Sequence, residues 1–333
     1  MIKLDLLDKK LLYELDLDAR QSFAQLSRKI KASQEVVRYR LKRLIDNKII
    51  EDFMTIIDIG RLGFYHYEVY FRFQKLNEQK ENELIKFIIN SNNVLWFSSC
   101  TGHYDLVFSV MAKNNIHFSE ILSKITNKYG EFIAERNIQS TIKIPHFTRA
   151  YLLPNKDVQE VSFSSASPHI IKIDQIDFKI LRTIMNNGRM PLIEIAHKLK
   201  LKEDTVKYRL KNLRKKGVIQ TFRPRLNKKN MGYLLYQILF SFKNLNDSLK
   251  KSFIEYCKSI GNVVYVLDTI GKYDFIVEVE PENQEHFNDL LKKIRNKYSN
   301  KIINYETISI TKEHKMDYFR IDKKEYFNNS KII

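Results

Sequence analysis

Residues 33–44 read SQEVVRYRLKRL, and residues 202–213 read KEDTVKYRLKNL, the same pattern 169 positions later. Each stretch places apolar residues at i, i+4 and i+7, the spacing of one buried helix face. These residues are Val37, Leu41 and Leu44 in the first stretch and Val206, Leu210 and Leu213 in the second. The other positions are mostly charged or polar. The sequence therefore predicts two copies of one basic, amphipathic helix.

The offset of 169 residues aligns the chain with itself far beyond these helices. It pairs Asp5 with Asp174 near the start of each copy and still pairs Tyr129 with Tyr298, about 125 residues later. Composition alone does not hold one ungapped register for so long, so the chain is interpreted as a tandem duplication. Residues 154–169 are rich in Ser and lack periodicity, and we expect them to form a linker between the copies.

Two shorter helical patterns precede each basic helix. In the first copy they cover residues 5–16 and the run through Phe23, Leu26 and Ile30. Ser33 is placed to cap the third helix, whereas Lys202 stands at the equivalent position, so the second basic helix is expected to begin less firmly. Three helices of this kind predict a helix-turn-helix, in which the third helix enters the major groove of DNA.

The candidate DNA-binding residues lie on the polar faces of the two third helices, where they offer donors and acceptors to phosphates and base edges. They are Ser33, Gln34, Glu35, Arg38, Tyr39, Arg40, Lys42, Arg43, Lys202, Glu203, Asp204, Lys207, Tyr208, Arg209, Lys211 and Arg214. The base-facing positions differ between the copies. We therefore expect an asymmetric DNA site with half-sites one or more helical turns (~34 Å) apart.

Composition limits the classes of protein and partner. The 57 Lys and Arg residues against 39 Asp and Glu give a formal charge of +18, which favours double-stranded DNA as a partner. Two cysteines at non-equivalent positions predict no disulfide framework and a cytoplasmic location. No stretch approaches 18 apolar residues, so no membrane partner is expected. The eight histidines show no metal-ligand spacing, so we expect neither a metal nor a cofactor.

A period-two aromatic run follows each third helix and opens an α/β pattern. In the first copy the expected order is strand 65–74, helix 78–90, strands 94–101 and 104–112, helix 116–128 and strand 132–144. In the second copy strands are expected near 233–243, 263–270, 273–280 and 302–312, with helices near 247–260 and 284–298. The order βαββαβ predicts a ferredoxin-like sandwich.

The predicted fold class is α+β, a winged-helix or helix-turn-helix domain plus a ferredoxin-like βαββαβ sensing domain, with the pair repeated twice. The expected helix-turn-helix domains are residues 1–60 and 170–229, the sensing domains are 61–153 and 230–321, and 322–333 form a tail. Runs such as Tyr67, Val69, Phe71 and Phe73 suggest that both sheet faces are hydrophobic. Face-to-face pairing of two sheets would cover them, as an intrachain pseudo-dimer or between chains of a homo-oligomer.

Together with these elements, the turns TGHYDL at 101–106 and IGKYDF at 270–275 resemble the Lrp/AsnC (feast/famine) family of regulators. That resemblance implies sensing domains that dimerise through their sheets, assemble further and bind an amino acid or similar effector near the Gly-x-Tyr-Asp turn. By resemblance the effector-binding candidates are Gly102, Tyr104, Asp105, Gly271, Tyr273 and Asp274. A structural interpretation stays open, because Gly and Asp are also the residues that tight turns require.

Two other functions compete with a DNA-binding transcription regulator. Siroheme decarboxylases also join a helix-turn-helix to an AsnC-like domain, but the histidine-containing segment expected of them is missing from residues 94–102, so we expect no enzyme. A scaffold or effector-binding protein without DNA contact is the third alternative. Sequence-specific DNA binding, modulated by a possible amino-acid effector, is the function that the sequence favours.

Overall fold

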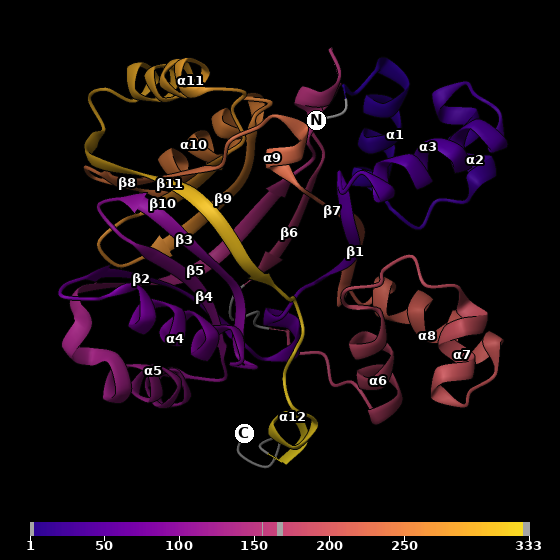
Figure 1. Cartoon of the computed structure of the whole chain (residues 1–333), viewed down its shortest axis with the longest axis horizontal. Helices are drawn as coiled ribbons and strands as arrows, with labels where there is room; N and C mark the ends of the chain where they lie inside the picture. The colour runs from indigo at the N-terminus through magenta and orange to yellow at the C-terminus, as the bar shows by residue number, and fades with distance from the viewer. Residues whose placement is uncertain (1–2, 155, 165–168, 329–333) are drawn as a thin grey trace.

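The computed structural model describes residues 3–154, 156–164 and 169–328. Each copy begins with three helices, and the helix-turn-helix prediction is confirmed. The helices are α1 (Leu6–Leu17), α2 (Phe23–Ile30) and α3 (Gln34–Asp46) in the first copy, and α6 (Gln175–Ile184), α7 (Leu192–Leu199) and α8 (Glu203–Lys215) in the second. Both groups lie on the same side of the molecule (Figure 1).

The two third helices begin differently, as their cap residues predict. The hydroxyl of Ser33 accepts a hydrogen bond from the Val36 amide (3.3 Å) at the start of α3. The side chain of Lys202 makes no capping bond at the start of α8. An uncapped first turn leaves its amides to other partners, so α8 begins without the side-chain support that α3 has.

Strand β1 (Ile50–Ile57) follows α3, and strand β7 (Ile219–Leu226) follows α8. The two strands pair antiparallel in a two-stranded sheet that joins the copies. A reciprocal arginine contact reinforces this junction. Arg20 donates to the carbonyl of Gly188 (2.8 Å), and Arg189, its repeat equivalent, donates to the carbonyl of Ala19. The same contact made twice shows that a pseudo-twofold axis relates the two helix-turn-helix units.

The α/β part of each copy has the predicted βαββαβ order, which confirms the fold class. In the first copy the elements are β2 (Tyr65–Phe73), α4 (Glu78–Ile89), β3 (Val94–Gly102), β4 (Leu106–Ala112), α5 (Asn115–Tyr129) and β5 (Ile133–Phe147). In the second they are β8 (Tyr236–Phe242), α10 (Asp247–Ser259), β9 (Val263–Ile270), β10 (Phe275–Val279), α11 (Gln284–Lys297) and β11 (Ile302–Met316). The short helix α9 (Lys228–Met231) precedes β8.

The two four-stranded sheets join along both edges within the chain. Strand β3 of the first copy pairs with β11, and β5 pairs with β9, so the order β2-β4-β3-β11-β8-β10-β9-β5 closes where β5 pairs with β2. We call this ring of eight strands the closed sheet. Closure removes the exposed strand edges that a single sheet of this type presents.

In the part of the chain that the structure describes, helices cover the outside of the closed sheet. Helices α4 and α5 lie against the first copy, and α10 and α11 lie against the second (Figure 1). The interior holds a separate buried cluster that includes Tyr70, Trp96, Tyr104, Tyr265 and Tyr273. The closed sheet therefore has two outer cores and one interior shared by both copies.

The expectation that both sheet faces are hydrophobic holds in full for the outer face and in part for the inner face. Tyr67, Val69 and Phe71 point toward α4 and α5. The intervening positions His66 and Glu68 are buried at 5% and 3% exposure and face the interior, because successive residues of a strand point to opposite sides. The interior of the closed sheet is consequently part polar.

The segments outside the repeats are more ordered than expected. Within the predicted linker, strand β6 (Glu160–Ser164) pairs antiparallel with β5, and in the predicted tail α12 (Lys323–Asn328) is helical. Residues 155 and 165–168 of the linker and 329–333 of the tail lie outside the described residues. Among the described helices, none has the length and apolar character needed to cross a bilayer.

Candidate functional site

Most residues predicted to bind DNA form matching exposed faces on the recognition helices α3 and α8. On α3 the exposed side chains are Gln34, Glu35, Arg38, Tyr39 and Lys42, with Ser33 at the cap. On α8 they are Glu203, Asp204, Lys207, Tyr208, Lys211 and Arg214, with Lys202 at the cap. The equivalent residues Tyr39 and Tyr208 are each 67% exposed. Large aromatic side chains this far from any core are available to a partner.

Arg40 and Arg209 are turned away from these faces. The guanidinium of Arg40 lies 2.7 Å from Asp5 and 2.8 Å from Asp8 on α1. Arg209 repeats this contact with Asp174 (2.5 Å) and Asp177 (3.3 Å) on α6. Hydrogen bonding to Asp5 raises the pKa of Arg40. Both arginines therefore fasten a recognition helix to the first helix of its own copy.

Arg43 and Arg214 also have acidic partners. Arg43 pairs with Asp8, and Arg214 reaches across the copies to Asp18 (2.9 Å). Arg214 nevertheless keeps 43% of its side chain exposed. Surface pairs of this kind exchange partners at little cost, so Arg214 is still able to meet a phosphate.

A cationic groove lies beside α3 where the two helix-turn-helix units meet. Its lining includes Arg20, Arg38 and Arg189, together with Ser22 at the start of α2. The guanidinium groups of Arg38 and Arg189 lie 4.2 Å and 5.4 Å from the ring of Phe23. Three arginines beside a helix start make this groove suited to an anionic group such as a DNA phosphate.

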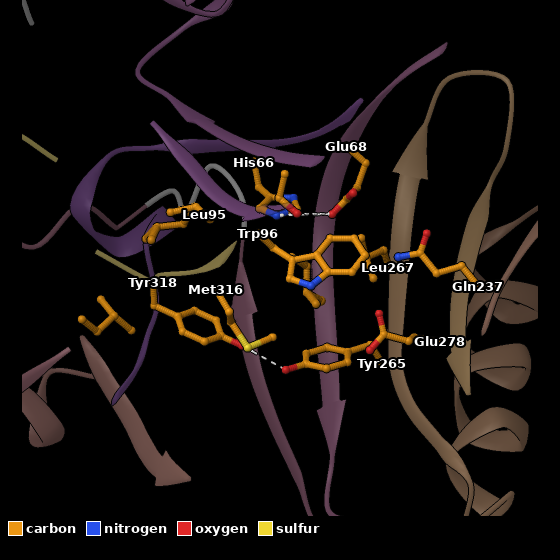
Figure 2. A pocket seen from close by; sticks show the side chains of 14 residues that line it. His66, Glu68, Leu95, Trp96, Gln237, Tyr265, Leu267, Glu278, Met316 and Tyr318 are labelled. Atoms are coloured by element: carbon orange, nitrogen blue, oxygen red, sulfur yellow. Dashed lines mark hydrogen bonds and ion pairs between the residues drawn. The ribbon is translucent and has the colours of Figure 1, made fainter. Parts of the chain in front are cut away.

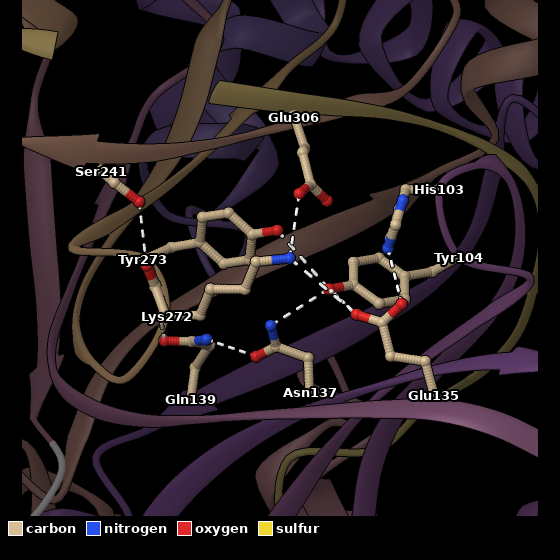
Figure 3. Close-up of polar contacts among 9 residues, drawn as sticks. All are labelled: His103, Tyr104, Glu135, Asn137, Gln139, Ser241, Lys272, Tyr273 and Glu306. Atoms are coloured by element: carbon tan, nitrogen blue, oxygen red, sulfur yellow. Dashed lines mark hydrogen bonds and ion pairs between the residues drawn. The ribbon is translucent and has the colours of Figure 1, made fainter. Parts of the chain in front are cut away.

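The Gly-x-Tyr-Asp turns meet at the pseudo-twofold axis (Figure 3). The hydroxyls of Tyr104 and Tyr273, which are repeat equivalents, are 3.5 Å apart, and both residues are fully buried. Asp105 accepts a hydrogen bond from the Phe73 amide (2.7 Å). Asp274 does the same for Phe242 (2.7 Å). These carboxylates therefore fix the turns to the neighbouring strands.

Gly102 and Gly271 each lie against the backbone or side chain of a strand from the other copy. Gly102 has φ +128°, and a Cβ there would stand 2.7 Å from the carbonyl oxygen of Thr307 on β11. A Cβ on Gly271 would overlap the Gln139 side chain. The glycines are thus needed for the strand pairing between the copies.

Charged residues surround the two tyrosines. His103 lies 2.8 Å from Glu135, Lys272 lies 3.0 Å from Glu306, and the Asn137 amide donates to the Tyr104 hydroxyl (3.0 Å). Burial raises the pKa of Tyr273. All six predicted effector residues therefore lie where the two Gly-x-Tyr-Asp turns meet, a region that we call the Gly-x-Tyr-Asp seam. Within it, the tyrosines and aspartates hydrogen-bond to other residues of the chain.

A second candidate site lies inside the closed sheet, at residues where the sequence predicted no site. Its pocket is lined by apolar side chains such as Trp96, Leu267 and Met316 and by the carboxyl groups of Glu68 and Glu278 (Figure 2). His66 lies 3.7 Å from Glu68, and the Tyr265 and Tyr318 hydroxyls are 2.9 Å apart.

Burial shifts the pKa of each titratable group around this pocket. It raises the pKa of Glu68 from 4.5 to about 7 and that of Glu278 to about 8, and it lowers the pKa of His66 from 6.5 to about 3. The charged form is disfavoured in each case because the pocket offers little water. The imidazole of His66 is therefore neutral at physiological pH, and the carboxyl of Glu68 titrates near physiological pH.

Comparisons with known proteins match both helix-turn-helix units. The model of the AsnC-type helix-turn-helix domain matches residues 4–45, and a winged helix-turn-helix DNA-binding model matches residues 173–220. The HTH-type transcriptional regulator Ptr1 of Methanocaldococcus jannaschii is 34% identical over 104 residues, 31% of this chain and 69% of Ptr1. The HTH-type transcriptional regulator FL11 of Pyrococcus furiosus is 33% identical over 121 residues, 36% of this chain and 78% of FL11.

The chain belongs to the Lrp/AsnC family. The assignment made from the sequence is confirmed. FL11 and Ptr1 match 36% and 31% of this Lrp/AsnC chain, as expected when one chain carries the unit twice.

Solved structures of one protein resemble this Lrp/AsnC chain over nearly its whole length. The crystal structure of the siroheme decarboxylase NirDL superposes with a TM-score of 0.64 at 14% identity, covering 97% of this chain and 96% of NirDL. At this identity the likeness shows the shared fold alone. The prediction that the chain is not an enzyme is nevertheless wrong, because the protein with the same full-length architecture is an enzyme.

Proposed function

We propose that this Lrp/AsnC chain is a sequence-specific transcription regulator that binds double-stranded DNA through α3 and α8. The observation that supports this function is the repetition of one exposed polar face on both recognition helices, with a reciprocal Arg20–Arg189 junction holding the helices in a fixed relation. A fixed pair of recognition helices is the arrangement that reads two half-sites on one face of a duplex.

The proposed contacts divide by position. Residues 34, 35, 38 and 39 and their equivalents 203, 204, 207 and 208 lie near the helix starts, where base edges are read, and Lys42, Lys211 and Arg214 lie farther along for phosphates. The groove with Arg20, Arg38 and Arg189 supplies a further phosphate site. Arg40 and Arg209 act as positioning residues, because α1 and α6 hold them.

We also propose that the closed sheet replaces a dimer of single-unit chains, making the chain an intrachain pseudo-dimer that can assemble further. Pairing of β3 with β11 and of β5 with β9 within one chain supports this. A small effector such as an amino acid would act by binding between the two halves. The buried cysteines 100 and 257, both free, suit a cytoplasmic location.

Selection from a random DNA pool followed by fluorescence anisotropy tests this function. The double variants Arg38→Ala/Lys42→Ala and Lys207→Ala/Lys211→Ala should each weaken binding about tenfold or more and lower the slope of log K against log salt by about 1, because Lys42 and Lys211 are the members assigned to phosphates. A matched double variant on α11, Lys292→Ala/Lys293→Ala, removes the same charge from an exposed face away from the recognition helices and should bind normally.

Equal losses in all three double variants would show a general charge effect and refute the assignment of α3 and α8. Failure to select any sequence would refute specific DNA binding. In a parallel titration with siroheme, a saturable shift of its absorption band would favour an enzyme of the NirDL architecture instead.

A further inference from the structure

The interior pocket has a composition that neither the DNA-binding surface nor the Gly-x-Tyr-Asp seam explains. Glu68 is 3% exposed and lines the pocket, and its Oε1 accepts a hydrogen bond from Ser109 (2.6 Å). Its other oxygen, Oε2, is buried and has no hydrogen-bond partner within the described residues. A buried carboxylate oxygen without a donor costs free energy, so Oε2 is a vacant acceptor on a side chain that lines the pocket.

The second carboxyl of the pocket belongs to the other copy. Glu278 on β10 is the repeat equivalent of Ser109, and Gln237 is the equivalent of Glu68, so the acidic and neutral partners have exchanged strands between the copies. Glu278 keeps some accessible surface and lines the pocket. Lys228 lowers the pKa of Glu278 against the effect of burial, so Glu278 already has a neighbouring positive charge. The basic side chain that the described residues place beside Glu68 is the neutral His66.

The walls of the pocket are apolar and aromatic. Trp96 and Tyr265, which are repeat equivalents, stand on β3 and β9, and Leu267 and Met316 complete the wall (Figure 2). Aromatic faces attract organic cations, and aliphatic walls favour an apolar body. Among the described residues that line the pocket, His66 is the one basic side chain, and burial keeps it neutral.

We infer that the pocket binds a compact organic ammonium ion, with its cationic nitrogen at Glu68 Oε2 and its apolar body between Trp96 and Tyr265. The ammonium supplies the donor that Oε2 lacks, and the carboxylate balances its charge. A neutral or anionic molecule of the same shape satisfies only part of this arrangement. Since Glu68, His66 and Ser109 have different residues at their equivalent positions, the pocket accepts the ligand in one orientation.

The pocket also touches the segment that leads to the DNA-binding part. Ile57 ends β1, the strand that pairs with β7 between the helix-turn-helix units, and Ile59 follows it; both line the pocket. Ligand binding itself does not depend on the proposed function. A regulatory effect of the ligand does rest on it, because that effect requires DNA binding by α3 and α8.

Trp96 is the single tryptophan of the sequence, so intrinsic fluorescence reports on this pocket directly. Three aliphatic probes of similar shape test charge: isopentylamine, 3-methylbutan-1-ol and 4-methylpentanoate. We expect isopentylamine to change Trp96 emission saturably and to bind at least tenfold more tightly than the alcohol or the carboxylate. Calorimetry of the same titrations supplies a second readout that does not depend on the indole.

Two variants of the full chain separate the pocket from general charge effects. Glu68→Gln removes the charge with little change of shape and should weaken isopentylamine binding at least tenfold, while Glu285→Gln on the exposed face of α11 should leave it unchanged. Thermal melts without ligand establish that each variant is folded. Equal affinity for amine and alcohol, unchanged affinity in Glu68→Gln, or no binding of the amine by either readout would overturn the inference.

Repeating the anisotropy assay with isopentylamine distinguishes the two proposals. If the amine titrates Trp96 while no DNA is bound under any condition, the pocket is supported and the DNA-binding function fails. If DNA is bound normally and no amine binds, the reverse holds.

Discussion

A buried ion network joins the N-terminal helix-turn-helix to the second copy of the closed sheet, and its removal should be strongly destabilising. Arg149, just after β5, donates through Nη1 to Asp16 on α1 (2.9 Å) and through Nε to Glu280 after β10 (2.8 Å). All three residues are at most 4% exposed. Coulombic attraction by Glu280 and Asp16 raises the pKa of Arg149 against the effect of burial.

The variant Arg149→Met leaves two carboxylates buried without their cation. Breaking a buried pair in this way typically costs about 3–5 kcal/mol of unfolding free energy, because the remaining charge has lost its water and its partner. Two carboxylates share this arginine, so we expect a value near the upper end of that range. At that cost a domain of ordinary stability loses a third or more of its free energy of unfolding.

The other copy shows how the same positions are filled without charge. The equivalents of Asp16 and Glu280 are Met185 and Met111. The repeat offset increases by one residue within β11, because this strand contains a bulge. Met316 therefore pairs with Trp96, whereas His146 pairs with Tyr265, the equivalent of Trp96. By the same shift, the equivalent of Arg149 is Phe319. Met111 and Phe319 belong to one hydrophobic cluster, and the partly buried Met185 packs against it.

The triple variant Asp16→Met/Arg149→Phe/Glu280→Met should therefore recover most of what Arg149→Met loses, because apolar replacement of a whole buried network is often neutral. Urea unfolding followed by circular dichroism and by Trp96 emission measures both. A loss below about 1 kcal/mol in the single variant, or no recovery in the triple variant, would refute this reasoning.

Three further changes have expected outcomes. Lys202→Ser should stabilise the chain by about 0.5–1 kcal/mol in urea unfolding by capping α8; no gain would mean that another group already satisfies its first turn. Gly102→Ala should lower the free energy of unfolding by about 1–3 kcal/mol in the same assay, because the residue has φ +128° and faces the Thr307 carbonyl. A neutral effect would contradict that contact. Because burial raises the pKa of Glu68 from 4.5 to about 7, the folded chain holds this proton more tightly than the unfolded chain and loses stability as pH rises between those values, by on the order of 3 kcal/mol. Glu68→Gln should remove that part of the pH dependence in unfolding titrations from pH 5 to 8, and parallel curves for both proteins would exclude it.

Local chemistry made the individual elements predictable. Helix α3 was located from its 3.6-residue period and from Ser33, and the strands were located from their period of two. The closure of the sheet was not predictable in the same way. Pairing of β3 with β11 joins residues more than 200 positions apart, and no local pattern encodes such a partner. Strand β6 was missed because Ser-rich segments lack the period that marks a strand, and it forms only by adding to β5.

Side-chain roles were predictable where the repeat preserved them and hidden where they depend on a distant element. Arg40 fits a basic DNA-binding face by its position in the helix, but Asp5 and Asp8 on another helix determine where it points. The repeat did hold a signal, since both aspartates and the arginine recur at Asp174, Asp177 and Arg209. Glu68 was overlooked although a charge inside the strand YHYEVYFRF is unusual, because alternation alone does not show that the second face is also buried.

Duplication within one chain explains how the interior pocket became asymmetric. In a symmetric dimer of single units, a carboxyl at the position of Glu68 would appear twice around the axis, together with two histidines and two serines. Here each substitution changes the shared interior once. Glu68 faces Ser109 in one copy, and Gln237 faces Glu278 in the other. The Arg149 network is likewise present on one side only. An interior with the vacant Glu68 acceptor on one side and an ionic link to one helix-turn-helix unit is expected to transmit ligand binding unequally to α3 and α8, whereas two identical and equally occupied sites would act on both helices alike.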